Sequence, residues 1–297
     1  MKIFDCFMYY NEDLILDLRL NYLEKFIDFF VIVESLYNHK GEKKTLNFNI
    51  KNYQKFKEKI IYIVLDHLPD SIEKINDGDD EDVKNGKYIL NGYRRDNFQR
   101  NYIVNGIKNA SMDDLILISD LDEIPNLKNL NLGKIKNGLI FFKQKMCYYK
   151  FNLYLKSFNW VGTKACKKKN LISPQWLRNI KDRSYPFWRI DTFFSKNKYS
   201  DIYFVNNGGW HFSYINSAEG IENKLKSYTH HREYELNPLG VKKIENRIKN
   251  RETVYDLNVD QRTNQFEKGQ KLDILELNEL PNHIRDNQNK YQLWLEN

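Results

Sequence analysis

The sequence predicts an α/β fold whose mainly parallel sheet is covered by helices on both faces. Short apolar runs rich in β-branched residues alternate along the chain with segments of helical periodicity. The runs are nearly continuous in apolar character, which is typical of strands buried on both faces. The chain has 297 residues, enough for one large α/β domain or two smaller ones with a substantial core.

The first third of the chain predicts three strands and one helix. The strands are apolar and aromatic, and the helix carries Leu16, Leu20, Leu23 and Phe26 close to helical spacing. The expected strands are residues 3–10, 29–35 and 59–66, and the expected helix is residues 14–26.

The middle of the chain predicts a loop, a helix and a buried strand. Residues 73–87 are polar and acidic with two glycines, which indicates a surface loop. A metal site from Asp77, Asp79 and Asp80 is a weaker alternative there, because the ligand spacing and terminal Glu of an EF-hand loop are missing. We expect a helix at residues 94–109 with Phe98, Tyr102, Ile103 and Ile107 turned inward, and a strand at residues 115–119.

The last part of the chain is less regular. We expect a long strand or hairpin at residues 138–155, irregular aromatic structure at residues 171–200, and a helix from Ser217 to about Tyr228. One or two helices and an extended tail follow. The domains we expect are a catalytic domain at residues 1–235 and a helical extension, packed on it, at residues 236–297.

Net charge, cysteine spacing and the length of the apolar runs indicate which ligands and which compartment the protein suits. The formal charge of +7 suits an anionic ligand, a membrane face or nucleic acid, but no single basic block dominates, so solvated lysines are the simpler explanation. Cys6, Cys147 and Cys166 show neither zinc nor disulfide spacing, which favours buried thiols in a reducing compartment. Without a signal-peptide pattern or an apolar run near the roughly 20 residues of a membrane span, we expect a soluble, cytoplasmic protein.

Three carboxylates follow the strand at residues 115–119. Asp120, Asp122 and Glu123 come directly after an apolar run, at the sheet edge where α/β proteins bind ligands. Clustered carboxylates repel one another, and a divalent cation such as Mg²⁺ or Mn²⁺ removes that penalty. The two aspartates, two positions apart, then point the same way and share the ion with phosphate oxygens. A solvated acidic turn or a helix cap is the simpler alternative.

Six segments resemble glycosyltransferase family 17, in the family's order. The segment DDLILISDLDEIP is similar to the family's metal-binding segment. The other matching segments, which together span roughly residues 3–235, are DCFMYYNEDLILDLRLNYL, FFVIVES, LDHLP, RRDNFQR and GGWHFSYINSAEGIENKL.

The resemblance implies a GT-A fold, a UDP-sugar donor with UDP-GlcNAc as first choice, a Mn²⁺-type cofactor and inversion at the anomeric carbon. Phe212 stands where the animal enzymes carry Cys. Those enzymes also have a membrane anchor and stem not found here, which argues against a Golgi enzyme acting on N-glycans. The expected acceptor is therefore a glycan, a lipid-linked saccharide or a glycoprotein, with peripheral membrane contact allowed.

The resemblance also suggests the metal ligands. Asp122 is the first candidate, and Asp120 is expected either to ligate or to bond the donor's ribose. His211, after the flexible Gly208 and Gly209, is the third, with a packed histidine as the equal alternative. Trp210 is expected mainly in the core, with stacking on an acceptor sugar as its functional role.

Five further residues are expected to bind the donor. Glu34 ends a strand and is placed to accept from the uracil or ribose. Arg95 and Arg100 are expected to neutralise the diphosphate, Gln99 to bond a base or hydroxyl, and Lys224 to hold phosphate. The alternative for Glu34 is a surface glutamate at a strand end, and for the two arginines it is salt bridging on a helix surface. The adjacent His230 and His231 match a histidine of bacterial relatives or are surface residues.

An inverting transfer needs a general base near the acceptor hydroxyl. Glu219 matches the family position and starts a helix beside the Gly-Trp-His segment, although a glutamate there also simply favours the helix dipole. Asp191 and Glu123 are rivals.

Other function classes fit less well. A phosphatase of the haloacid dehalogenase type has its Asp pair near the N-terminus, followed by Thr or Val. In this sequence the pair is central and is followed by Glu123. A nucleic-acid-binding module has no supporting motif. A non-catalytic protein that binds nucleotide-sugars or glycans remains the alternative.

Overall fold

The computed structural model describes most of the chain. The ranges it describes are residues 1–130, 138–186, 188–189, 191, 194–227, 234–235, 238–256, 266 and 268–296. His230 and His231 lie outside these residues.

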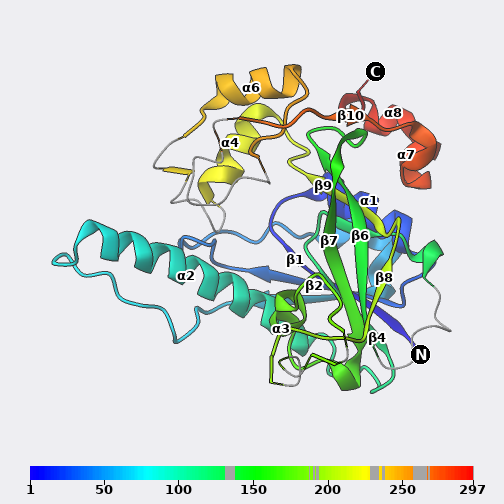
Figure 1. Ribbon diagram of the computed structural model, residues 1–297, viewed down its shortest axis with the longest axis horizontal. Coiled ribbons are helices and arrows are strands. Elements are labelled where there is room, and N and C mark those ends of the chain that lie inside the picture. Colours follow the sequence, from blue (N-terminus) through cyan, green and yellow to red (C-terminus); the bar gives the residue numbers. More distant parts are fainter. Residues whose placement is uncertain are drawn as a thin grey trace.

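A single mixed sheet forms the centre of the described chain (Figure 1). Its strand order is β3-β2-β1-β4-β7-β6-β9-β5, with β8 and β10 paired at the side to β6 and β7. The strands are β1 (Ile3–Tyr9), β2 (Phe29–Ser35), β3 (Ile60–Leu65), β4 (Leu115–Ser119), β5 (Glu123–Pro125), β6 (Leu139–Tyr148), β7 (Leu153–Lys167), β8 (Ile202–Val205), β9 (Gly209–Ser213) and β10 (Asp273–Ile274).

The first four strands are parallel, as the sequence predicts; β1, β2 and β4 are largely buried, whereas β3 at the sheet edge is mostly half-buried. Along β4, Leu115 and Leu117 face one hydrophobic cluster, while Ile116 and Ile118 face another. This alternation follows from the two-residue period of a strand. All four strands therefore end at the same edge of the sheet.

The second half of the sheet is mixed. β7 runs antiparallel to β4, and β6 and β7 form an antiparallel hairpin, one of the two alternatives expected at residues 138–155, with β7 continuing to Lys167. β9 then pairs parallel to β6 and antiparallel to β5. The short strand β5 follows β4 in the chain and pairs with β9, which places His211 opposite Glu123.

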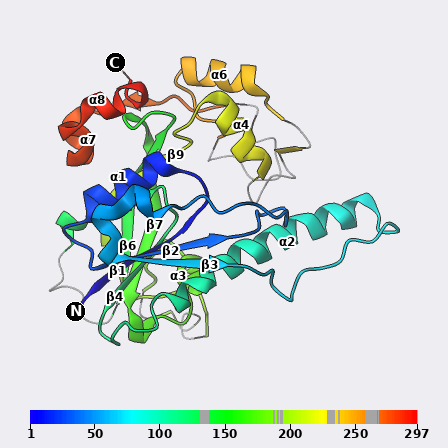
Figure 2. The same cartoon turned by 180° about the vertical axis from the view of Figure 1, so that it is seen from behind.

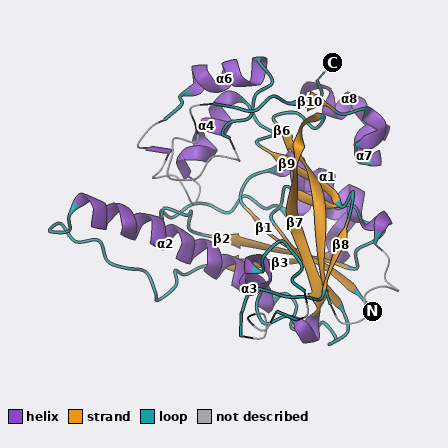
Figure 3. Cartoon of the chain, viewed as in Figure 1, coloured by secondary structure: helices purple, strands orange, loops and turns teal. Residues whose placement is uncertain are grey.

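Helices cover both faces of the sheet (Figure 3), which confirms the α/β prediction. α1 and the C-terminal α7 and α8 pack on one face, and α3 and the chain after α2 pack on the other. The helices are α1 (Asp13–Leu23), α2 (Glu81–Asn101), α3 (Pro174–Asn179), α4 (Ala218–Ser227), α6 (Val241–Lys249), α7 (Asn282–Asp286) and α8 (Gln288–Tyr291).

Helix α2 differs from the prediction at both ends. It starts at Glu81, inside the expected loop 73–87, and ends at Asn101, where a 3₁₀ helix, Tyr102–Asn105, follows. Its first half projects beyond the sheet in both views (Figure 2), so no apolar stripe marks it in the sequence. Two acidic residues in its first turn, Glu81 and Asp82, favour helix there through the dipole.

The C-terminal segment shares the main core. Leu275, Leu280, Ile284 and Tyr291 are buried in the same cluster as Phe7 of β1. The division into residues 1–235 and 236–297 stays a prediction. Within the described ranges, no helix has the length and apolar character needed to cross a membrane.

Candidate active site

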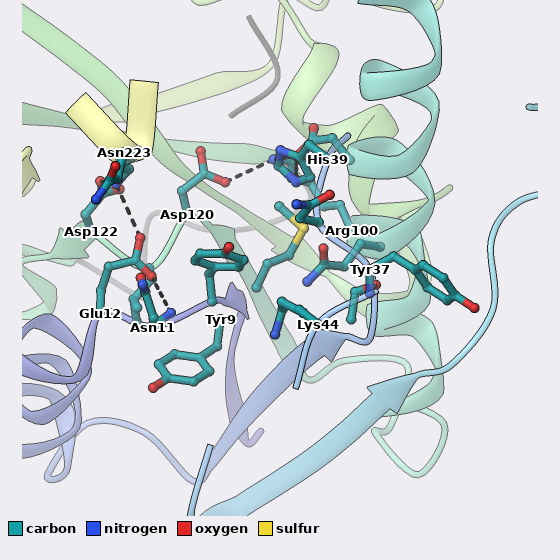
Figure 4. A pocket seen from close by; sticks show the side chains of 18 of the residues that line it. Tyr9, Asn11, Glu12, Tyr37, His39, Lys44, Arg100, Asp120, Asp122 and Asn223 are labelled. Atoms are coloured by element: carbon teal, nitrogen blue, oxygen red, sulfur yellow. Dashed lines mark hydrogen bonds and ion pairs between the residues drawn. The ribbon is translucent and has the colours of Figure 1, made fainter. Parts of the chain in front are cut away.

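A cavity of about 690 Å³ opens where β1, β2 and β4 end (Figure 4). The second half of α2 and helix α4 also line it. Its lining includes Tyr9–Glu12 after β1, Ser35 and Tyr37–His39 after β2, Tyr93, Asp96, Gln99 and Arg100 of α2, Asp120–Asp122 after β4, His211 of β9, and Asn216, Gly220, Asn223 and Lys224 around α4.

The acidic turn after β4 divides its carboxylates between two roles. Asp120 and Asp122 line the pocket. Glu123 does not: its side chain is fully buried and accepts hydrogen bonds from Trp160 Nε1 at 2.7 Å and from the backbone N–H of Asp120 at 2.9 Å. Both Nη atoms of Arg178 also donate to it, at 2.7 and 2.9 Å. Glu123 therefore stabilises the turn from behind.

Asp120 is held between two arginines. Arg100 donates to its Oδ1 at 3.0 Å, and Arg178 donates to its Oδ2 at 3.1 Å. Burial favours the neutral acid, but the positive charges of Arg178 and Arg100 together outweigh it and hold the pKa of Asp120 well below its usual range. Asp120 is thus ionised throughout the physiological pH range.

Asp122 meets a different pair of groups. Its Oδ1 lies 3.4 Å from His211 Nε2, and its Oδ2 lies 3.6 Å from Lys224 Nζ. Burial acts to raise the pKa of Asp122, but the charges of His211 and Lys224 lower it below its usual value. Lys224 also reaches Glu12, 3.3 Å away on the pocket wall.

The imidazole of His211 has a raised pKa. Burial acts against its charged form, but the carboxylate of Asp122 outweighs burial and favours the imidazolium. The ring lies 5.1 Å from that of Trp160, centroid to centroid. Its buried Nδ1 has no hydrogen-bond partner among the residues that the structure describes.

Positive groups lie along the α2 side of the pocket. Figure 4 shows Asp122 and Glu12 on one side, His39 and Arg100 on the other, and Asp120 between them. The Nε atoms of Arg95 and Arg100 are buried without an acceptor in the described part of the chain. Arg95 lies outside the lining and donates to the backbone oxygen of His39 at 2.8 Å. The unused Nε of Arg100, a lining residue, suits an anionic ligand.

Glu34, predicted to bind the donor, and Trp210, expected mainly in the core with acceptor stacking as its functional role, lie outside the pocket lining. Glu34 is fully buried and accepts from Lys44 Nζ at 2.6 Å and from the backbone N–H of Asn47 at 2.7 Å, so it orders the segment after β2. Trp210 packs edge-on against Tyr22 with ring centroids 5.4 Å apart, in agreement with the core alternative.

The two carboxylates favoured as general base also lie outside the lining. Glu219 is exposed in the first turn of α4, where its own backbone N–H and Ser217 lower its pKa. Asp191 is paired with Arg189 and Lys198, which lower its pKa to about 2. Gln99 and Lys224, in contrast, line the pocket, and their binding of the donor stays a prediction.

Apart from tyrosines, four charged or titratable lining residues have no role in the sequence prediction. Glu12 had a usable signal, because it follows the first strand just as Asp120 follows the fourth. Lys44 and His39 had none, whereas Asp96 lies four positions before Arg100 on the same helix. His39 Nε2 lies 3.8 Å from Asp96, which in turn accepts from Arg100 at 2.7 Å. Tertiary folding brings His39 to this helical pair.

The donor set fits a metal ion shared with a ligand better than a closed protein site. Among the described residues there is no group of three or more His, Cys, Asp or Glu side chains arranged to hold an ion. Asp122 and His211 are adjacent, whereas Asp120 is engaged by arginines. Mg²⁺ and its relatives are commonly held by one or two carboxylates together with substrate phosphates. Two protein ligands beside an anion pocket match that pattern.

The chain is similar to known proteins over most of its length. The family model for Glycosyltransferase family 17 matches residues 1–296. The chain is 26% identical over 233 residues to the beta-1,4-mannosyl-glycoprotein 4-beta-N-acetylglucosaminyltransferases of Homo sapiens and of Rattus norvegicus. The Mus musculus protein of the same name is 25% identical over 233 residues. Each alignment covers 72% of this chain but 40% of the relative, so the chain spans less than half the length of these proteins.

Proposed function

The chain belongs to glycosyltransferase family 17, and on this premise we propose that it is a metal-dependent, inverting glycosyltransferase of the GT-A type. The donor is a UDP-sugar, with UDP-GlcNAc first because the relatives are named as N-acetylglucosaminyltransferases. The acceptor is a glycan, a lipid-linked saccharide or a glycoprotein. Peripheral membrane contact and a cytoplasmic location stay predictions.

One observation carries this proposal. Asp122 and His211 offer adjacent oxygen and nitrogen donors in a pocket whose lining also carries Arg100 and Lys224. Asp122 and His211 are suited to a divalent ion, and Arg100 and Lys224 are suited to a diphosphate. Bound there, Mn²⁺ or Mg²⁺ would supply positive charge to the departing diphosphate. Arg100 and Lys224 add fixed positive charge, which favours the leaving group further.

Within this proposal the general base has two candidates. Glu219 keeps its place from the family resemblance, although it lies outside the pocket lining. Glu12 lies on the pocket wall, with Oε1 3.3 Å from Lys224 Nζ. A carboxylate that faces the reacting groups is better placed to take a proton than an exposed one.

The experiment that tests the proposal measures both binding and transfer. UDP with Mn²⁺ should raise the melting temperature of the wild type, and Asp122→Ala should lose this shift. Asp113→Ala is the matched control, because Asp113 belongs to the same segment but pairs with Lys167 and Lys169 at the surface. UDP release should be screened over several UDP-sugars with and without Mn²⁺.

Two outcomes would count against the proposal. Equal thermal shifts in EDTA would exclude a metal-dependent nucleotide site at Asp122. A full Mn²⁺-dependent shift with no UDP release from any donor and acceptor would instead favour the alternative, a non-catalytic protein that binds nucleotide-sugars.

A further inference from the structure

Arg19 of α1 is a fully buried arginine next to the acidic turn. Its Nε and Nη2 donate to both carboxylate oxygens of Asp5 on β1, at 2.8 and 2.6 Å. Asp5 is also fully buried, so the two charges neutralise each other inside the protein. A bidentate pair of this kind fixes the plane of the guanidinium.

The rest of that guanidinium is directed at the turn after β4. Nη2 donates to the hydroxyl of Ser119 at 2.8 Å, at the end of the strand. Nη1 donates to three backbone oxygens, those of Asp120 at 3.1 Å, Leu121 at 2.9 Å and Glu123 at 2.8 Å. A guanidinium has five N–H donors, and every nitrogen of Arg19 is used here.

These contacts constrain the backbone where the pocket carboxylates are attached. The backbone oxygens of Asp120 and Leu121 face the buried guanidinium, while the side chains of Asp120 and Asp122 line the pocket. A turn whose oxygens are held from one side has little freedom to rotate its side chains away from the other. Since fixing a residue's backbone costs conformational entropy, a turn that is ordered in advance spares this cost when ligand binds.

We propose that Arg19 is a positioning residue that holds the Asp120–Glu123 turn so that Asp120 and Asp122 face the pocket ready for metal and diphosphate. The role in ligand binding rests on the proposed function; the ordering of the turn does not. A simpler explanation is that Arg19 only neutralises Asp5. The two differ in what Arg19→Lys should do, because lysine keeps the charge but cannot reach Asp5 and three backbone oxygens together.

The test compares Arg19→Lys with Arg247→Lys. Arg247 of α6 is also buried and donates to backbone oxygens, those of Thr253 at 3.3 Å and Phe266 at 2.7 Å, but it lies outside the pocket lining. Three quantities are measured: melting temperature, hydrogen–deuterium exchange of residues 119–124 without metal, and Mn²⁺ affinity with UDP, from the free Mn²⁺ signal in electron paramagnetic resonance.

Both variants should lose melting temperature, but only Arg19→Lys should exchange faster at the turn and bind Mn²⁺ about 10- to 100-fold more weakly, the usual effect of removing a group that orients metal ligands. Equal losses of Mn²⁺ affinity in both variants, or wild-type exchange and affinity in Arg19→Lys, would overturn the proposal.

Failure of the proposed function gives a different result. If the wild type binds no Mn²⁺ with UDP, the metal site is wrong, and exchange at residues 119–124 alone decides whether Arg19 orders the turn. If Arg19→Lys does not fold, Ser119→Ala replaces it, because it removes one acceptor of Arg19 and leaves the Asp5 pair intact. Faster exchange at the turn supports the proposal, and unchanged exchange overturns it.

Discussion

Replacing Arg178 by Met should destabilise the fold strongly. Arg178 meets the fully buried carboxylate of Glu123 at 2.7 and 2.9 Å and is itself only 12% exposed. At 2.7 Å the pair's attraction is about 6 kcal/mol for an effective dielectric constant near 20. Desolvation offsets much of this attraction, but removing one partner leaves an uncompensated buried charge, which costs about 3–5 kcal/mol.

Urea denaturation followed by tryptophan fluorescence measures this loss as a change in the free energy of unfolding. Glu123→Gln and the double variant complete a mutant cycle. Arg178→Met alone leaves the charge of Glu123 buried without its arginine. The double variant should therefore lose less free energy of unfolding than the sum of the two single losses, with a coupling energy of about 1–3 kcal/mol.

Arg183→Met is the matched control, since Arg183 is exposed and stacks over the ring of Tyr185. Its effect should stay within about 0.5 kcal/mol. A loss below about 1 kcal/mol for Arg178→Met, or no coupling in the cycle, would refute the view that this pair supports the acidic turn.

Three other predictions concern the pocket. The raised pKa of His211 contributes stability that is fully present below pH 6.5 and is lost as pH rises through the pKa of the folded state. Metal binding, in contrast, needs the neutral ring. The Mn²⁺ affinity measured by titration should therefore rise with pH in the wild type and stay flat in His211→Asn. Of Glu12→Gln and Glu219→Gln, the variant that replaces the base should bind UDP normally but transfer sugar about 100-fold or more slowly, and near wild-type turnover excludes a residue. Trp210→Phe should lower the melting temperature and leave the acceptor KM unchanged, and a raised KM would restore its role in acceptor binding.

Local pattern was sufficient for the main strands and the helix between the first two. The apolar runs of β1, β2 and β4 are recognisable because burial on both faces demands continuous hydrophobicity. The position of Asp120 and Asp122 at a ligand-binding edge follows from the same pattern, since parallel strands end together. Helix α2 was misplaced because its projecting half buries little and so carries no periodic signal.

The partners of each charge were beyond the reach of pattern. Asp120 pairs with Arg100 and Arg178, 20 and 58 positions away. Glu34 offered the same strand-end signal as Asp120, yet its carboxylate is taken up by Lys44 and neighbouring backbone N–H groups. Whether a carboxylate at a strand end faces a ligand or the interior depends on which cations fold beside it.

The sequence by itself determined the α/β class, the order of the first strands and the edge of the sheet where carboxylates gather. Only the tertiary structure decided that Asp120 and Asp122 face the pocket, that Glu123 is buried behind them, and that Glu219 lies outside the lining. The physical reason is the separation along the chain over which each effect acts. Hydrophobic periodicity acts between residues a few positions apart, whereas neutralising a buried charge such as that of Glu123 depends on Arg178, which lies 55 positions away along the chain.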